Sequence, residues 1–230
     1  MAAGPKGTAS RKASPAPLAT ASGAVSTRGR KTRAALVLAS RVVFERDGFL
    51  DARIVDICAE ANVAAGSFYT HFDDKKAIFR ALVDEVGVEM LEPVVDAEGH
   101  DESAADRVKR NNLSYFEAYK KNWRLMALFE EMSLIDETFR QLRLTRARAF
   151  SERNALVVRR LQATGQVDPT LDALLIAESL SAMVSRMAQL TFVWGQSSDM
   201  TALVDAVSHV WCSVLGLNTG PDPERPTQGD

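Results

Sequence analysis

The stretch Ile54–Phe72, IVDICAEANVAAGSFYTHF, has the pattern of a helix, a tight turn and a second short helix. In its first part, apolar residues recur at the i, i+3, i+4 and i+7 positions of one buried helical face: Ile54, Ile57, Cys58 and Ala61. Asn62 follows, and asparagine tolerates a left-handed turn better than any other residue except glycine. Two helices joined in this way are typical of units whose second helix enters the major groove of DNA.

The second short helix has two different faces. It opens with residues of little side-chain bulk, which let the backbone approach a large surface closely: Ala64, Ala65, Gly66 and Ser67. We expect Phe68 and Phe72, at i and i+4, to anchor its inner face. Hydrogen-bonding side chains then remain to face outward or lie at the rim: Ser67, Tyr69, Thr70 and His71.

A longer segment, GFLDARIVDICAEANVAAGSFYTHFDDKKAIFRAL (residues 48–82), surrounds this unit. Together with Phe44, just before it, this segment carries residues that match the sequence pattern of a known family. They are Phe44, Gly48-Phe49, Asp56-Ile57, Ala61-Asn62-Val63, Gly66-Ser67-Phe68-Tyr69, His71-Phe72 and Lys75. This combination resembles the DNA-binding region of the TetR family of bacterial transcriptional regulators. The chain departs from the family pattern in having Asn62 in place of glycine, Ala64 in place of serine, and Ala52-Arg53 in place of Thr-Ser. The last two departures remove hydroxyl groups that cap helices or touch phosphate.

The resemblance implies a set of DNA contacts. Tyr69, His71 and Lys75 correspond to phosphate ligands, and the residues facing base edges are Ala65, Gly66, Ser67 and Thr70. Arg53, at the start of the preceding helix, is a further candidate for a phosphate or base contact. The alternatives are a core aromatic for Tyr69, a cap or buried hydrogen bond for His71, and a solvated charge for Lys75. Phosphate contacts fix the register of a protein on DNA, whereas base contacts specify the sequence.

The charge of the chain is unevenly distributed. Its 230 residues carry a net charge of −2, with 46% apolar and 25% charged residues, as in ordinary globular proteins. Residues 1–44 contain eight Lys or Arg and no Asp or Glu, which leaves 20 basic and 30 acidic residues in the remainder. A basic end and an acidic body indicate that only one end meets nucleic acid.

The periodicity predicts an all-α chain with a three-helix DNA-binding domain at residues 30–77 and a larger helical ligand-binding and dimerisation domain at 78–217. Residues 1–29 and 218–230 are predicted to be disordered tails. The first tail is either a solubilising segment or a DNA-binding arm that uses Arg28, Arg30, Lys31 and Arg33. The helices are expected at residues 32–46, 54–61, 64–72, 75–91, 104–121, 123–133, 136–164, 171–194 and 200–217, with Asp73-Asp74 capping the fourth and a loop at 92–103.

The resemblance also implies that the body binds a small molecule. Aromatic, methionine and asparagine residues on the expected inner faces are candidate ligand contacts: Asn112, Tyr115, Tyr119, Trp123, Met126, Phe129, Phe150, Asn154, Met183 and Met187. Arg186, a charge within an apolar helix, either pairs with Glu130 or Glu131 or binds an anionic group of the ligand. Such a lining suggests a lipid-like or aromatic effector.

Two C-terminal helices carry apolar stripes that can seat another helix. One includes Ile176, Leu180, Met183, Met187, Leu190 and Trp194, and the other includes Val204, Val207, Trp211 and Val214. We expect the helices at 171–194 and 200–217 to form a homodimer interface. A two-fold dimer reads a near-palindromic DNA site, with half-sites about 34–36 Å or a multiple of that apart.

Several other functions are disfavoured by the sequence. The three histidines, His71, His100 and His209, are scattered, and no nucleophile motif, phosphate loop, paired carboxylates or metal cluster occurs, so no catalytic residue, metal or cofactor is expected. Cys58 and Cys212 lie in apolar patterns, and neither a membrane span nor a signal peptide is recognisable, which favours a cytoplasmic protein. The expected function is a ligand-released repressor. The rivals are an all-helical enzyme and a helical protein-interaction module.

Overall fold

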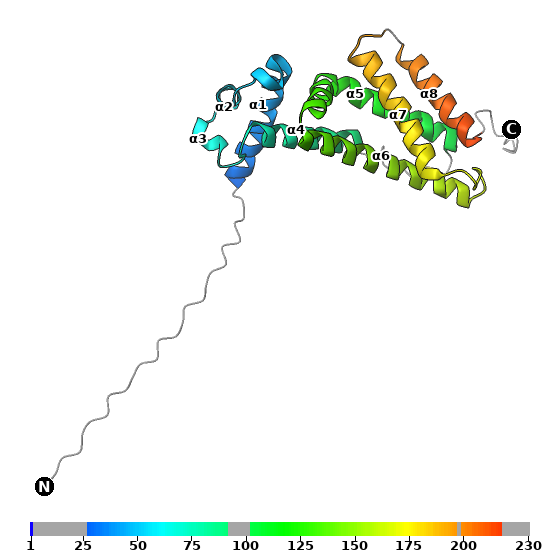
Figure 1. The fold of residues 1–230 in the computed structure, drawn as a ribbon, viewed down its shortest axis with the longest axis horizontal. Helices are drawn as coiled ribbons and strands as arrows, with labels where there is room; N and C mark the ends of the chain where they lie inside the picture. Colours follow the sequence, from blue (N-terminus) through cyan, green and yellow to red (C-terminus); the bar gives the residue numbers. More distant parts are fainter. Residues whose placement is uncertain (2–26, 92–101, 197–198, 218–230) are drawn as a thin grey trace, which may run out of the picture.

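The computed structural model describes Met1 and residues 27–91, 102–196 and 199–217, and these residues form eight helices and no strand (Figure 1). A smaller head contains α1 (Thr27–Asp51), α2 (Ile54–Glu60) and α3 (Ala65–Phe68), and α4 (Lys75–Leu91) leads into the body. The body consists of α5 (Ala104–Ile135), α6 (Glu137–Ala163), α7 (Ala173–Phe192) and α8 (Met200–Leu215). The predicted all-α fold is confirmed. The predicted C-terminal tail and most of the predicted loop at 92–103 lie outside the described residues.

The core of the head extends across α4 into the body. Phe44 of α1, Ile57 of α2 and Phe68 of α3 are fully buried. Ile54 and Ala61, predicted for the same buried face as Ile57, are half-buried. The Phe79 ring of α4 lies 5.1 Å from Phe44, 5.0 Å from Phe49 and 5.2 Å from Phe139 of α6, measured between ring centroids. One buried cluster therefore joins the head to α4, α5 and α6.

The ends of α1 differ from the prediction. The helix begins at Thr27 rather than Thr32, so residues 27–29, predicted to belong to the tail, are helical. The good helix formers Arg28, Arg30 and Lys31 support this extension, and the Thr32 hydroxyl donates to the carbonyl of Arg28 at 3.1 Å. Gly48 interrupts the helix near its predicted end with a φ of 76°, and the chain then turns on to Asp51.

The two helices predicted at 104–121 and 123–133 are one helix, α5, and the predicted break between them is wrong. Asn122, which lies at the predicted break, is fully buried inside α5. Its amide donates to the Ala118 carbonyl at 2.9 Å and to the Glu89 carboxylate at 3.4 Å. These two acceptors satisfy the NH2 of the amide, so the side chain is held inside the bundle, whereas its buried Oδ1 has no partner among the described residues.

The body packs α6 against α7 and α5 against α8, and its buried faces differ in part from the predicted stripes. On α7 the buried residues are mostly small: Ala173, Ala177, Leu180, Ser181, Val184 and Ala188. Trp194, predicted to lie on the stripe of this helix, is 62% exposed. Small residues allow the helix axes to approach closely, and the larger side chains then lie at the edges of the contact. No helix in the described part of the chain is long and apolar enough to cross a membrane.

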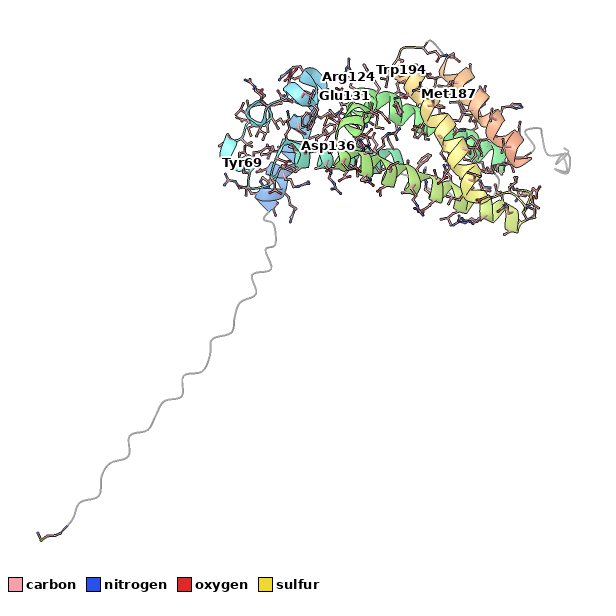
Figure 2. All side chains as sticks on the ribbon, in the orientation of Figure 1. Tyr69, Arg124, Glu131, Asp136, Met187 and Trp194 are labelled. Atoms are coloured by element: carbon pink, nitrogen blue, oxygen red, sulfur yellow. The ribbon has the colours of Figure 1, made fainter. Side chains whose placement is uncertain are left out.

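Polar contacts tie α4 to the body at three levels. Lys76 donates to Asp136, which also accepts from the first backbone N–H groups of α6 (Figure 2). Farther along, the Arg146 guanidinium donates to the Val83 carbonyl at 2.6 Å and to the Asp84 carboxylate at 3.0 Å. Near the end of α4, Glu89 accepts from Lys121 and Asn122 of α5. Arg146 fits against α4 because Gly87 has no Cβ there.

We expect Gly87→Ala to destabilise the protein by about 1 kcal/mol. A Cβ at Gly87 would lie 2.5 Å from Nη2 of Arg146, so the guanidinium must leave its acceptors. Losing a hydrogen bond to a charged group costs about 1.5–3 kcal/mol, which outweighs a gain of about 1 kcal/mol in helix propensity. An Arg146→Met background has no guanidinium to displace, so only the gain in helix propensity remains. In that background Gly87→Ala becomes stabilising. Denaturant unfolding of the four variants measures this, and equal effects in both backgrounds would contradict it.

Candidate nucleic-acid interface and ligand cavity

The turn between α2 and α3 is closed by the backbone. Asn62 has a φ of 53°, in the left-handed region expected from the sequence. Its N–H donates to the Ala59 carbonyl at 3.1 Å, and the N–H of Val63 donates to the Cys58 carbonyl at 3.0 Å. This pair of bonds is the Schellman arrangement that ends many helices. It fixes the direction in which α3 leaves α2 without requiring glycine.

The outer face of α3 presents the predicted contact residues to solvent. Phe68 and Phe72 are buried below it, as the i, i+4 spacing predicts. Ala65, Gly66 and Thr70 are exposed, and Ser67 and His71 are half-buried. Tyr69 is 63% exposed at the far edge of the head, with its ring 5.4 Å from that of Phe68 (Figure 2). The face is therefore accessible to a macromolecule as large as a DNA duplex.

Neither α2 nor α3 has a side-chain cap at its start. Arg53 precedes α2 and Ala64 precedes α3, both in extended conformation and without a side-chain hydrogen bond to the helix. These are the two places where the sequence lacks the hydroxyl residues of the family pattern. Such caps typically contribute about 1 kcal/mol, so packing of Ile57, Phe68 and Phe72 must hold these short helices in place.

Basic groups surround this face. Arg53, with a 72% exposed side chain, forms a two-point ion pair with Asp56 at 2.7 and 2.9 Å. The guanidinium of Arg33, in the basic first turns of α1, lies 4.9 Å from the centre of the Phe72 ring. Helix α1 therefore places one basic residue, Arg33, against Phe72, which follows α3 in the chain.

Lys75 has a structural role that the sequence did not reveal. Its ammonium group donates to the Leu50 carbonyl at 2.8 Å and to the Ala52 carbonyl at 2.7 Å. It also lies 4.9 Å from the centre of the Phe49 ring, and partial burial lowers the pKa of the amine. In this position Lys75 satisfies two carbonyl groups at the end of α1 and joins that end to α4.

The body contains a cavity of about 510 Å³ between α4, α5, α6, α7 and α8. Four of the predicted ligand contacts line it: Asn112, Tyr115, Phe150 and Asn154. Apolar side chains from α6 and α8 form much of the remaining wall, and two α4 residues, Glu89 and Met90, border it as well. Its volume and mixed lining are typical of small-molecule sites.

Hydrogen bonds hold the polar residues of the cavity in place. Asn112 donates to the Ser208 hydroxyl and Asn154 to the Ser181 hydroxyl, each at 3.0 Å. Burial raises the pKa of Tyr115, while its hydrogen bond with Ser185 opposes that shift. The Lys121 ammonium lowers the pKa of Glu89, which keeps this carboxylate ionised at neutral pH. The cavity is therefore built from oriented groups.

Residues 36–82 match the family model described as "Bacterial regulatory proteins, tetR family". The match runs from the buried face of α1 through α2 and α3 to the middle of α4. This segment of the chain is similar to the TetR family.

Solved structures of TetR-family regulators have the same fold. A putative TetR-family transcriptional regulator from Rhodococcus sp. is 21% identical, with a TM-score of 0.68 over 81% of this chain and 99% of that chain. The fatty acid degradation regulator FadR from Bacillus halodurans is 16% identical, with a TM-score of 0.68 over 81% and 97%. FadR from Bacillus subtilis, in complex with stearoyl-CoA, is 17% identical, with a TM-score of 0.66 over 79% and 98%. Comparison with curated protein sequences finds no significant match.

Seven predicted ligand contacts lie outside the cavity. Tyr119 belongs to the buried core of the body, and four half-buried residues pack against that core: Trp123, Met126, Met183 and Met187. Phe129 belongs to the core that joins head and body. These residues share the helical spacing of the cavity lining, so periodicity alone did not separate them from it.

The seventh is Arg186, and its predicted pair with Glu130 or Glu131 is wrong. Glu130 pairs with Arg143 at 2.7 Å, whereas the exposed Arg186 donates to Gln189. Its guanidinium also lies 4.3 Å from the centre of the exposed Trp194 ring, near the end of α7 (Figure 2). Arg186 therefore lies at the surface, where its charge needs no buried partner.

Arg153 and Trp211 are among the cavity residues that were not predicted as ligand contacts. Arg153 is half-buried in the wall, with its guanidinium 5.1 Å from the centre of the Phe150 ring, and burial lowers its pKa. Trp211, predicted for the dimer interface, is buried and lines the cavity. Arg153 could have been predicted from its position, because it precedes Asn154 and lies one turn after Phe150, two residues that were predicted as ligand contacts.

We expect Lys75→Met to lower the free energy of unfolding by about 1–3 kcal/mol, because the Leu50 and Ala52 carbonyls lose their donor. Arg53→Met serves as a matched control, since an exposed ion pair contributes about 1 kcal/mol or less. Urea unfolding monitored by circular dichroism measures both variants. A Lys75→Met effect no larger than that of Arg53→Met would contradict the structural role.

Proposed function

We propose that the chain is a homodimeric repressor that binds a near-palindromic operator and is released by a small, largely apolar effector. The observation that carries the DNA-binding part is the accessible Ala65–Thr70 face of α3, held over the buried Phe68 and Phe72. Exposed hydroxyl groups and a nearly bare backbone allow close approach to phosphates and base edges. Arg53, Tyr69 and His71 are the proposed phosphate contacts, and Lys75 positions them.

A second copy is proposed to dock on α7 and α8. Their outward sides carry small or apolar residues: Leu175, Ser179 and Ala182 on α7, and Ala202, Ala206, Val210 and Val214 on α8. Leu175 is 60% exposed, and an unpaired side of this kind is suited to helix packing against a two-fold partner. Such a dimer presents one α3 to each half-site of an operator, about 34–36 Å apart or a multiple of it.

The cavity supports the effector part of the proposal. Its apolar wall favours an apolar body, and the fatty acid regulators among the structural neighbours, one of them in complex with stearoyl-CoA, support a lipid-like molecule. Glu89 and Met90 of α4 line the cavity, whereas Lys75 at the other end of α4 contacts the head. A molecule that favours one position of α4 therefore shifts the spacing of the two α3 helices. A ligand moves the equilibrium between two conformations only if it binds one of them more tightly than the other.

Selection of bound sequences from random duplex DNA tests the DNA-binding part. We expect a near-palindrome to be enriched by the wild type and lost with Tyr69→Ala, since the variant removes a phosphate contact at the exposed edge of α3. Leu38→Ala, which changes an α1 residue of similar exposure, is the matched control and should keep the enrichment. No enrichment by a folded dimer at low salt would contradict operator binding and favour a protein-interaction role.

A further inference from the structure

The ligand cavity is elongated along two antiparallel helices. Its α5 lining runs from Ala104 to Tyr115, about 17 Å of helix. Its α6 lining runs from Phe150 to Thr164, about 21 Å. Because a single residue, Asp136, joins α5 to α6, the two helices run in opposite directions, and the ring centres of Tyr115 and Phe150 lie 5.5 Å apart. These two rings therefore mark one end of the cavity, its aromatic end, and the start of α5 and the end of α6 form the other, its polar end.

The two ends differ in exposure and polarity. The described lining residues at the polar end include four exposed polar side chains: Arg107, Arg160, Thr164 and Gln166. The described lining residues at the aromatic end are all half-buried: Glu89, Met90, Ser114, Tyr115 and Phe150. An amphipathic molecule therefore gains most by placing its polar group at the polar end and its apolar part toward the aromatic end.

Packed side chains close the aromatic end. Behind Tyr115, the ring centre of Tyr119 lies 6.1 Å away, and that of Phe192 lies a further 6.1 Å from Tyr119. Tyr119 is 2% exposed and belongs to the buried core of the body. The Glu89 carboxylate at this end accepts from Lys121 and Asn122, so its charge is compensated without a ligand. The aromatic end is therefore a wall against which an apolar group stops.

We propose that the cavity binds one unbranched alkyl chain lengthwise, with its head group at the polar end, and that Tyr115 and Phe150 set the longest chain that fits. This inference deepens the proposed effector site and rests on it. A volume of about 510 Å³ spread over several helical turns leaves a narrow space, and apolar side chains from α5 and α6 line it between the two ends: Val108, Val157 and Leu161. A branched or fused-ring molecule of the same volume needs a wider and shorter space.

Chain length then controls affinity in two stages. Each methylene group buried between the two ends tightens binding about fourfold. Once the chain reaches the aromatic end, a further methylene either stays in water or forces the packed rings apart, so it adds no affinity. This end is also where the cavity meets α4, because Glu89 and Met90 line it there. Chains that reach the limit therefore contact the helix that joins head and body.

Two series of ligands with growing chains test the proposal. Isothermal titration calorimetry of the full chain compares hexanoate to hexadecanoate with hexanoyl- to hexadecanoyl-coenzyme A, all below their critical micelle concentrations. In at least one series we expect the dissociation constant to fall about fourfold per methylene up to one chain length and then to level off or rise. The series that binds more tightly distinguishes a free carboxylate head from a coenzyme A head, with coenzyme A alone as control.

Variants of Phe150 move the limit in opposite directions. Phe150→Ala lengthens the cavity, so a chain two methylenes beyond the wild-type limit should gain about tenfold in affinity. Phe150→Trp shortens the cavity and should move the limit to shorter chains, so it decides the matter if Phe150→Ala does not fold. Val157→Ala is the matched control, because Val157 lines the cavity from the same helix about 10 Å farther from the aromatic end. This control should weaken binding without moving the limit.

A dissociation constant that keeps falling through the longest chains would overturn the proposal, as would a limit that stays in place in both Phe150 variants or moves equally in Val157→Ala. Absence of binding by both series would overturn it too. Operator selection with the same preparation distinguishes this failure from failure of the proposed function. An enriched operator without alkyl-chain binding leaves a regulator whose effector has another shape.

Discussion

The packing of Phe79 is the contact on which the relation between head and body depends. This α4 residue is fully buried and lies against Phe44 and Phe49 of α1 and Phe139 of α6. Burial of a phenylalanine contributes about 1.5–3 kcal/mol, and each aromatic pair adds about 0.5–1.5 kcal/mol. Because the partners come from both parts of the chain, α4 cannot leave either part without exposing the cluster.

Polar contacts then give α4 a defined position. Lys75 holds the end of α1, Arg146 holds the middle of α4 to α6, and Glu89 meets α5 beside the cavity. Buried and half-buried charges of this kind need specific partners, so they favour one register between the helices. The same helix therefore contacts the surface proposed for DNA and the cavity proposed for a ligand. This arrangement is the physical basis for proposing that occupancy of one affects the other.

Local patterns predicted the head well. The spacing of Ile57, Cys58, Phe68 and Phe72 predicts their burial, and the left-handed conformation of Asn62 follows from its own side chain and the helix it ends. These features depend on neighbours in sequence. The Asp residue expected to cap α4 does so, since Asp74 accepts from the Ala77 N–H at 2.7 Å.

The body was predicted less well, because its key groups depend on distant partners. Asn122 lies buried within α5 because Glu89 and Ala118 accept from its NH2 group, and Arg186 lies outward against Trp194. Trp211 has the spacing of an interface residue, yet it lines the cavity. Helical periodicity predicts which residues share one face of a helix, but it does not predict which element or cavity that face contacts. Cavity and core residues therefore look alike in sequence.

Native-state hydrogen exchange of the wild type and Phe139→Leu tests most directly whether α4 joins head and body into one unit. Phe139 belongs to α6, and its ring lies 5.9 Å from that of Phe49 in α1. The shared cluster predicts that the variant lowers the protection of the Val43 and Phe44 amides in α1 by about 1 kcal/mol, together with that of α5 amides. Loss of protection confined to the body, with unchanged α1 amides, would contradict the account.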